Sequence, residues 1–213
     1  MKCDKKYMLL YAVTDRTWVG EKTLYQQVEE ALRGGVTCVQ LREKDMGDED
    51  FLQEAKEIHA LCQQYGVPFI VNDNVAVAVA CGAEGIHVGQ EDMAAGDVRR
   101  QVGSSMILGV SVHTVEEARE AVHNGADYLG LGAVFPTSTK TDVDQMPNET
   151  LRAICDAVDV PIVAIGGINR SNIGKLAGSG VDGGALVSAI FSAPEIETTC
   201  RELRRLAEEM VNA

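Results

Sequence analysis

The chain has no long apolar run. Its 213 residues contain no stretch that approaches the roughly 18–20 apolar residues a membrane-crossing helix needs. The basic start, MKCDKKYMLLYAVTD, has only a short apolar part before an acidic loop, which favours a first strand over a signal peptide. We therefore expect a cytoplasmic protein with no membrane partner.

Positive charge is also scarce. The chain has 19 lysines and arginines against 32 aspartates and glutamates, a formal net charge of −13. Such a surface repels polyanions, so nucleic acid and anionic membranes are excluded as general partners. If the protein binds phosphate groups, its few cations must be concentrated at one place.

The cysteines lack the spacing of metal or redox motifs. None belongs to a C-x-x-C pair, and their spacing matches no zinc site. Several fall within apolar patterns, where cysteine behaves as a small core residue. We expect buried free thiols rather than disulfides at Cys3, Cys38, Cys62, Cys81, Cys155 and Cys200.

Four stretches of the chain share one pattern, in which a helix end is followed by a glycine, one small residue and a short apolar run. The glycines lie at intervals of 47, 43 and 55 residues, at Gly35, Gly82, Gly125 and Gly180. A glycine after a helix can take the left-handed conformation that ends it. Each interval has room for another strand and helix, so the repeat predicts units of two strands and two helices.

Eight short apolar segments are predicted strands, at 9–13, 36–41, 68–71, 85–88, 106–111, 127–131, 161–165 and 182–187. Amphipathic segments such as FLQEAKEIHALCQQYG alternate with them. Units of about 25 residues predict an α/β fold, a single (β/α)₈ TIM barrel over residues 1–213, with no linker. The alternative is an open doubly wound sheet, but the first strand ends in VTDRTW instead of a G-x-G-x-x-G turn.

The second strand runs into a cationic cluster. Barrel active sites lie at the carboxyl ends of the strands, where this strand has the sequence QLREK, residues 40–44. Alternation places Gln40, Arg42 and Lys44 on one side and Leu41 on the other. Arginine offers phosphate a planar fork and lysine a compact charge, which favours phosphate binding. The alternative is that both cations pair with neighbouring surface carboxylates.

The third and fourth strands end in carboxylates. Asn72 and Asp73 follow one strand, and Asp92 follows the next, beside Glu91. Successive barrel strands are neighbours, so Asp73 and Asp92 are expected to approach each other. Mg²⁺ prefers a few carboxylates completed by phosphate oxygens and water, and the pair predicts a Mg²⁺ site. Helix capping is the alternative for each residue taken singly.

The sixth strand precedes an unusually long connection, roughly residues 132–147, where ordinary loops have about 2–6 residues. Long polar loops on rigid barrels are often lids, which is the function expected for this one. Its polar residues are hydroxyls and one cation, Thr137, Ser138, Thr139 and Lys140.

Three further strand ends complete the candidate site. Ser111 ends the fifth strand, Gly166 and Gly167 follow the seventh, and Val187 and Ser188 close the eighth. Loops after the seventh and eighth strands, with a helix N-terminus, form the common phosphate site of barrels. At the first strand, Asp15 is predicted to cap the next segment, and Trp18 either covers a ring or packs on the rim. His87 is assigned a structural role.

Together these segments resemble the thiamine-phosphate synthase family. The matching stretches are YAVTD, QLREK, VNDN, GIHVGQED, LGVSVHT, GLGAVFPTSTKTD, VAIGGI and LVSAI, which span almost the whole chain. The resemblance implies a transferase of a pyrimidinylmethyl group. It would condense 4-amino-2-methyl-5-hydroxymethylpyrimidine diphosphate with hydroxyethylthiazole phosphate, giving thiamine phosphate and pyrophosphate, with Mg²⁺ as cofactor.

The resemblance also assigns residues. It places the pyrimidine diphosphate against Gln40, Leu41, Arg42, Glu43, Lys44, Asn72, Ser111 and Lys140. It places the thiazole phosphate against Thr137, Ser138, Thr139, Gly167, Val187 and Ser188. Mg²⁺ falls on Asp73 and Asp92. The catalytic residues would stabilise the charge on the departing diphosphate, and they are Arg42, Lys44 and Lys140.

Two other functions remain open from the sequence. A thiazole tautomerase-like isomerase would need no diphosphate and metal site, so the cation and carboxylate clusters count against it. A non-catalytic barrel could bind both phosphorylated ligands without turnover. The chain offers no convincing Ser-His-Asp or Cys-His set, which agrees with a reaction whose nucleophile is the thiazole nitrogen. Whether the protein forms a homo-oligomer is left open.

Overall fold

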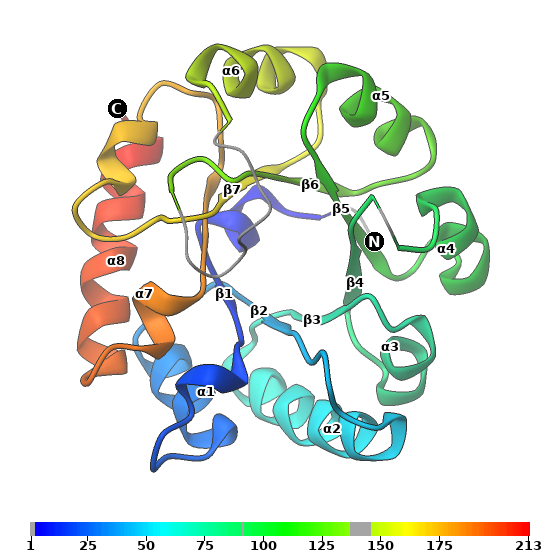
Figure 1. Cartoon of the computed structure of the whole chain (residues 1–213), viewed down its shortest axis with the longest axis vertical. Coiled ribbons are helices and arrows are strands. Elements are labelled where there is room, and N and C mark those ends of the chain that lie inside the picture. The colour runs from blue at the N-terminus through cyan, green and yellow to red at the C-terminus, as the bar shows by residue number, and fades with distance from the viewer. Residues whose placement is uncertain (1–2, 91, 137–145) are drawn as a thin grey trace.

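Eight parallel strands close into a barrel in chain order in the computed structural model, and the sheet pairs β1 with both β2 and β8 (Figure 1). The structure describes residues 3–90, 92–136 and 146–213. The strands are β1 Leu10–Val13, β2 Cys38–Leu41, β3 Phe69–Asn72, β4 Gly85–Val88, β5 Ile107–Val112, β6 Tyr128–Leu131, β7 Ile162–Ile165 and β8 Gly183–Leu186. The (β/α)₈ barrel predicted from the repeat is confirmed.

Helices surround the barrel between the strands. They are α1 Leu24–Arg33, α2 Asp48–Tyr65, α3 Val75–Cys81, α4 Ala95–Val102, α5 Val115–His123, α6 Asn148–Ala157, α7 Ser188–Phe191 and α8 Ile196–Val211. The described residues also form three 3₁₀ turns, η1 Lys5–Met8 before β1, η2 Arg16–Trp18 after β1 and η3 Ile173–Leu176 between β7 and β8. Within the described part of the chain, no helix is long and apolar enough to cross a membrane.

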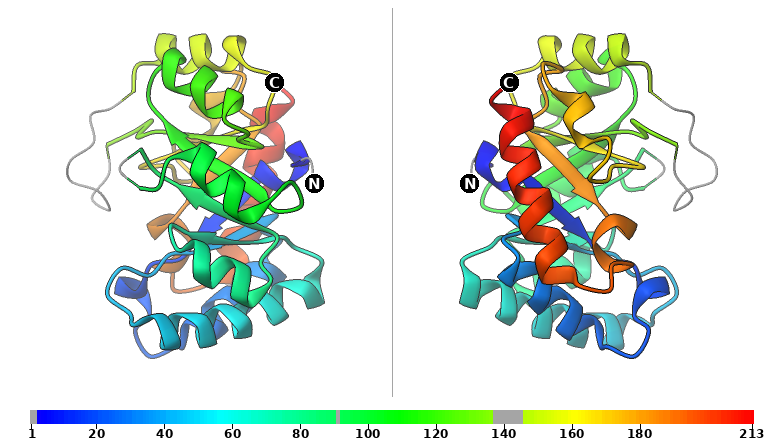
Figure 2. Two further views of the ribbon diagram at one scale, coloured as in Figure 1. Left: turned by 90° about the vertical axis from the view of Figure 1, so that its right-hand side faces the viewer. Right: turned by 90° about the vertical axis from the view of Figure 1, so that its left-hand side faces the viewer.

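One predicted helix is much shorter than the repeat suggested. The segment before Gly180 forms only the turn η3, where a full helix was expected. Its sequence, NRSNIGKLAGSG, is rich in asparagine and glycine, which are poor helix formers. The long helix α8 packs against η3 and α1 and covers this face of the barrel instead (Figure 2).

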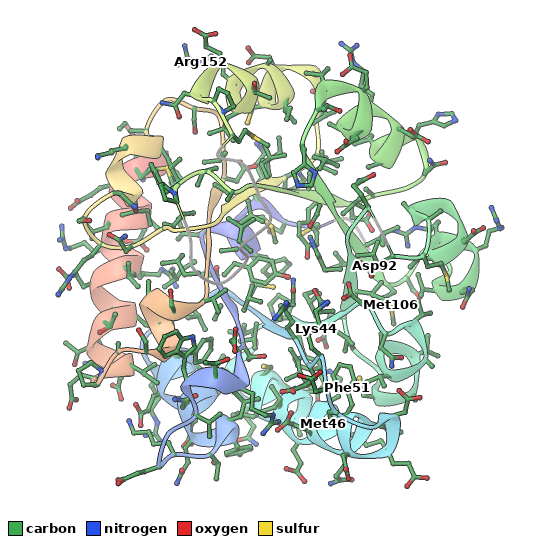
Figure 3. The ribbon with its side chains drawn as sticks, viewed as in Figure 1. Lys44, Met46, Phe51, Asp92, Met106 and Arg152 are labelled. Carbon is green, nitrogen blue, oxygen red and sulfur yellow. The ribbon has the colours of Figure 1, made fainter. Side chains whose placement is uncertain are left out.

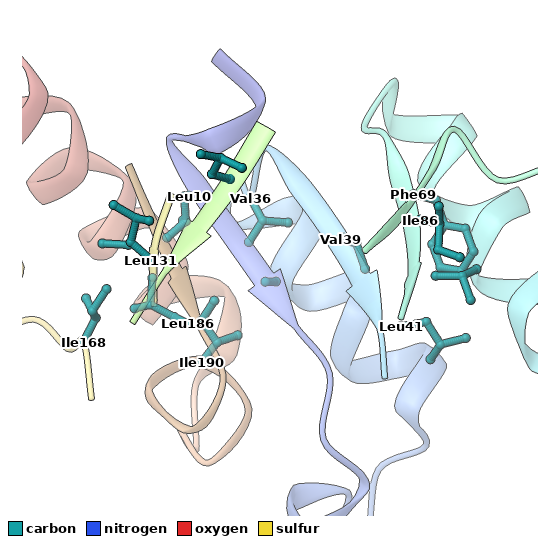
Figure 4. Packing of buried hydrophobic residues seen from close by; sticks show 14 of the residues in the cluster. Leu10, Val36, Val39, Leu41, Phe69, Ile86, Leu131, Ile168, Leu186 and Ile190 are labelled. Atoms are coloured by element: carbon teal, nitrogen blue, oxygen red, sulfur yellow. The ribbon is translucent and has the colours of Figure 1, made fainter. Parts of the chain in front are cut away.

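Strand side chains alternate between two cores. The outer core lies between the strands and the helices and includes Leu10, Val39 and Leu41 (Figure 4). The inner core fills the barrel with Tyr11, Cys38, Ile70, Ile107, Tyr128 and Val163, and Met8 of η1 belongs to it. Because the described side chains fill the barrel from η1 upward, the room for a ligand lies at the carboxyl ends of the strands.

All six cysteines are free thiols, as predicted. Cys3, Cys38, Cys62 and Cys200 are buried, and Cys81 and Cys155 are partly buried. Burial raises the pKa of Cys200 to about 12 and that of Cys155 to about 11. These thiols therefore stay protonated at neutral pH and act as packing residues.

The sequence repeat corresponds to a repeated hydrogen bond. Two residues after each repeat glycine, a side-chain oxygen accepts from a backbone N–H at the start of the preceding strand. The bonds are Leu10 to Thr37 at 2.9 Å, Phe69 to Glu84 at 2.9 Å, Leu108 to Asp127 at 2.9 Å and Ile162 to Asp182 at 2.8 Å. All four repeat glycines have positive φ. Each unit of two strands is thus tied together at the amino end of the barrel.

Removal of one tie should destabilise the barrel measurably. In Glu84→Ala, the buried N–H of Phe69 loses its side-chain acceptor, and Nε2 of His59 loses a partner at 3.0 Å. A buried donor left unsatisfied costs about 1–3 kcal/mol, so urea unfolding should show a loss of that size. Glu120→Ala, on the exposed face of α5, is the control and should stay within about 0.5 kcal/mol. Equal losses in the two variants would show that the tie contributes nothing.

Candidate active site

A cavity of about 1130 Å³ opens at the carboxyl end of the barrel. Every strand or the loop after it contributes to its wall, from Val13 at β1 to Val187 after β8. Figure 3 shows Lys44 and Asp92 near the middle of this face, brought there from separate loops. This is the end at which barrel enzymes carry their active sites.

Most predicted site residues meet in this cavity. Those that line it are Gln40, Arg42, Lys44, Asn72, Asp92, Ser111, Gly167, Val187 and Ser188. Asp73 contacts this group through Lys44, whose Nζ lies 3.3 Å from its Oδ2. Other predicted residues lie outside the described ranges, namely Glu91, Thr137, Ser138, Thr139 and Lys140.

Two residues that were predicted to contact the ligand do not place their side chains in the cavity. Leu41 packs in the outer core, as strand alternation requires. The carboxylate of Glu43 is almost fully buried and accepts two hydrogen bonds from Arg16, each of 3.1 Å. Arg16 also donates to both oxygens of Glu54 at 2.7 Å. This Arg16–Glu43–Glu54 clamp joins the loops after β1 and β2 and holds the segment that carries the two cations.

The clamp separates the cations from their sequence neighbours. Glu43 pairs with Arg16, so it does not neutralise Arg42 or Lys44. Lys44 instead reaches Asp73, on the loop after the next strand. The described residues give the Arg42 guanidinium no ion pair, and its backbone N–H donates to Oγ1 of Thr14 at 3.0 Å. The cation pair is therefore available to an anion in the cavity.

Asp73 is not the helix cap that sequence alone allowed. Asn74 caps α3, since its Oδ1 accepts from the N–H of Val77 at 2.9 Å. Asp73 has φ 62°, the left-handed region, and its own N–H donates to the carbonyl of His87 at 2.9 Å. Asp92 accepts from the N–H of Gly89 at 2.7 Å. The carboxylate of Asp73 therefore does not cap a helix and instead pairs with Lys44.

The two carboxylates lie close enough to affect each other. Burial raises the pKa of Asp73, and the neighbouring Asp92 raises it further, while Lys44 opposes both effects. A cation between two such acids would relieve their repulsion. Across the described ranges no group of three His, Cys, Asp or Glu side chains could hold a metal. Two carboxylates fit Mg²⁺, which typically keeps waters and takes its other ligands from substrate phosphates.

The opposite wall has the character of an anion site. Gly166 and Gly167 follow β7 with φ of 99° and 63°, and the short helix α7 begins at Ser188. Within the described residues, the backbone N–H of Gly167 has no acceptor. Such N–H groups, beside the first turn of a short helix after β8, are where barrels bind phosphate.

The loops around this wall are tightly packed. A Cβ added at Gly167 would lie 2.3 Å from the carbonyl oxygen of Pro136 and 2.8 Å from that of Phe135. Phe135 donates its N–H to Gly166 O at 3.1 Å. Only glycine allows the two loops to approach this closely.

A buried hydrogen-bond chain forms the floor of the cavity. Gln40 Nε2 lies 2.8 Å from the Tyr11 hydroxyl, which lies 2.8 Å from that of Tyr128. His87 is 2.9 Å from Tyr128 through Nδ1 and 2.9 Å from Oγ of Ser111 through Nε2. Sequence analysis missed the two tyrosines. Their polar tips at inward strand positions were the available signal, because buried hydroxyls need partners.

At the first strand end, the prediction that Asp15 caps the next segment is confirmed. Asp15 caps η2 by accepting from the N–H of Thr17 at 2.9 Å. Trp18 is 38% exposed, and its carbonyl accepts from Gln27. Neither side chain is needed to explain the cavity's cations or carboxylates.

Comparisons with known proteins point to one family. A sequence profile described as thiamine monophosphate synthase matches residues 10–190. The chain is 47% identical over 194 residues to a thiamine-phosphate synthase of Clostridium tetani, covering 91% of this chain and 93% of the relative. It is 44% identical over 207 residues to one of Pyrococcus abyssi, covering 97% and 98%. A solved thiamine phosphate pyrophosphorylase from Pyrococcus furiosus has a TM-score of 0.89 at 39% identity, covering 97% and 98%. The chain therefore belongs to the thiamine monophosphate synthase family.

Proposed function

We propose that the protein is a thiamine-phosphate synthase, a transferase that joins an aminopyrimidine diphosphate to hydroxyethylthiazole phosphate. The products are thiamine phosphate and pyrophosphate. The observation that carries the proposal is one cavity with two walls whose residues suit phosphate groups. Arg42 and Lys44 lie beside the paired carboxylates on one wall, and Gly167 and Ser188 lie on the other. Two phosphorylated substrates need two such walls.

The diphosphate belongs on the wall with the cations. Arg42 would bind phosphate oxygens with its planar fork. Lys44 has three N–H donors, so it can keep Asp73 and still donate to a phosphate oxygen. Asp73 and Asp92 are the residues that would hold Mg²⁺. When bound there, the ion supplies positive charge to the oxygens of the departing diphosphate.

The chemistry requires charge stabilisation more than proton transfer. The bond between the methylene carbon and the diphosphate oxygen breaks, and the electron pair leaves with the diphosphate. The electron-rich aminopyrimidine stabilises the cationic methylene, and the thiazole nitrogen attacks it with its own lone pair. Preorganised cations at the developing negative charge are the main contribution of the protein. Apolar wall residues such as Val163, Ile165 and Ile168 help to keep water from the cation.

One assay tests the proposed function. The purified protein is mixed with both phosphorylated substrates and Mg²⁺, and thiamine phosphate is followed by chromatography. We expect formation of thiamine phosphate only when both substrates are present. Conversion of a thiazole phosphate tautomer without condensation would indicate an isomerase instead. Binding of both ligands without any product would indicate a non-catalytic barrel.

Replacement of Gly167 tests the assignment of the two walls. Gly167→Ala should weaken thiazole phosphate binding about tenfold or more, because the added Cβ displaces the Phe135–Pro136 segment and blocks close approach to the backbone. Binding of the pyrimidine diphosphate should change little. Calorimetric titration with each ligand separately measures both affinities.

Gly174→Ala is the matched control on the same connection. A Cβ there meets no atom within 4 Å, so both affinities should stay at their wild-type values. Equal loss of the two affinities in Gly167→Ala would contradict the two-wall assignment.

A further inference from the structure

The floor of the cavity is a chain of polar side chains in which each lies within hydrogen-bond distance of the next. It runs through Gln40, Tyr11, Tyr128, His87 and Ser111, which come from five different strands. Tyr11 and Tyr128 are 1% and 0% exposed, so water cannot substitute for a missing partner. We name this set the floor relay.

The amide group of Gln40 sets the direction of the relay. Its Nε2 can only donate, so the Tyr11 oxygen accepts from it, and the direction that continues along the chain puts the Tyr11 proton on Tyr128. The Tyr128 proton then goes to Nδ1 of His87. In this direction Nε2 of His87 carries the proton and donates to Oγ of Ser111.

The barrel makes room for the relay at two positions. A Cβ at Gly109 would lie 2.1 Å from the Tyr128 ring, and a Cβ at Gly130 would lie 3.2 Å from the His87 ring. The rings of Tyr11 and Tyr128 lie 6.0 Å apart between centroids, and those of His87 and Tyr128 lie 5.5 Å apart. These neighbours leave the rings little freedom to turn away from their partners.

The two ends of the relay face the cavity with opposite hydrogen-bonding character. Gln40 and Ser111 both line the cavity. Since Nε2 of Gln40 is used by Tyr11, its Oε1 is left as an acceptor. Since Oγ of Ser111 accepts from His87, its hydroxyl proton is left as a donor. Because each hydroxyl has a single proton, the direction at one link influences the direction at the next.

We propose that Tyr11, Tyr128 and His87 are positioning residues that fix Gln40 as an acceptor and Ser111 as a donor, and thereby select the amino form of the pyrimidine ring. The selection of the ring rests on the proposed function. An aminopyrimidine offers an N–H donor from its amino group and a lone pair from a ring nitrogen, which complements these two ends. A 4-oxo ring has the reverse pattern, with an oxygen acceptor and a ring N–H.

The polarity also matters for the reaction. As the diphosphate leaves, positive charge spreads from the methylene carbon onto the amino nitrogen. An amino N–H that donates to the Gln40 oxygen becomes a stronger donor as this charge develops, so the interaction is stronger in the transition state than in the ground state. A reversed Gln40 would place its own N–H groups against that charge.

The first test determines the tautomer of His87 in the absence of substrate. Two-bond ¹H–¹⁵N correlation spectra of the folded protein report which nitrogen of His87 carries the proton, with His87→Gln used to assign the signals. We expect the neutral form protonated on Nε2. In Tyr128→Phe, which keeps the ring but removes the donor to Nδ1, the signals should shift toward a mixture of tautomers. A wild-type His87 protonated on Nδ1, or a tautomer unchanged in Tyr128→Phe, would overturn the proposal.

The second test measures the preference for the amino form over the 4-oxo form of the pyrimidine ring. Calorimetry gives the affinities of the amino and 4-oxo forms of the pyrimidine diphosphate, and the wild type should prefer the amino form. Tyr128→Phe and Tyr11→Phe should each reduce this preference about tenfold or more, because the ends lose their fixed polarity. A purely structural role would weaken both ligands by the same factor and leave the ratio unchanged, which would contradict the proposal.

Tyr7→Phe is the matched control. It removes a tyrosine hydroxyl from η1, which packs against the same inner core but lies outside the relay. Its affinity ratio and His87 tautomer should equal those of the wild type. If the wild type forms no thiamine phosphate but keeps the Nε2 tautomer, the proposed function fails and the relay polarity stands.

Discussion

Asp73→Asn and Asp92→Asn are each expected to lower kcat about 100-fold or more while the protein stays folded. Both changes remove negative charge with almost no change of shape. Asparagine tolerates the left-handed backbone of residue 73, whose φ is 62°. At residue 92 the amide oxygen can still accept from the Gly89 N–H. Turnover at saturating and limiting Mg²⁺, with thermal unfolding alongside, measures the effect.

The double variant gives a sharper result. If the two carboxylates hold one ion, Asp73→Asn combined with Asp92→Asn should lose little more activity than either single change. Asp159→Asn is the control, since this residue is exposed on the loop between α6 and β7. Near-normal turnover of either single variant at limiting Mg²⁺ would rule out its role as a ligand. Glu91, outside the described residues, would then be the next residue to test.

The second large effect concerns the cation pair. Arg42→Met and Lys44→Met should each lower the rate constant of the chemical step on the order of 10²-fold, because each removes a preorganised positive charge that faces the leaving group. Rapid-quench measurement of bond breakage separates this step from product release. The affinity for thiazole phosphate should be unchanged in both variants.

Lys44→Met also removes the ion-pair partner of Asp73, because Nζ of Lys44 lies 3.3 Å from Oδ2 of that residue. Arg33→Met is the control, because Arg33 lies on the surface of α1, where it pairs with Glu29, and it does not line the cavity. If the two variants changed only the apparent thiazole affinity, the leaving-group assignment would be wrong.

The barrel could be predicted because its signals are local. Buried parallel strands read as short apolar runs, and the repeat glycines mark the ends of helical segments. The hydrogen bonds made by the residues after each glycine could not be predicted, because their partners lie elsewhere in the chain. Glu84 and Asp182 look like ordinary surface acids in the sequence, and only the fold shows them accepting from Phe69 and Ile162.

The candidate site also combines features that the sequence predicted with features that it could not predict. Strand alternation was enough to place Gln40 and Arg42 at the cavity, but it could not show that Arg16 holds the carboxylate of Glu43. That ion pair joins two loops and leaves no pattern in either one. The same holds for the floor relay, whose tyrosines lie 117 residues apart. The assignments of Thr137, Ser138, Thr139 and Lys140 stay predictions, outside the described residues.

The most direct test of the account is a single turnover in which enzyme exceeds the pyrimidine diphosphate. Thiazole phosphate is present, Mg²⁺ is varied, and both products are quantified in each quenched sample. We expect thiamine phosphate and pyrophosphate to appear one for one and only with Mg²⁺, and we expect Asp73→Asn to slow the formation of both equally. Pyrophosphate release without thiamine phosphate, or equal rates without Mg²⁺ and in Asp73→Asn, would contradict it.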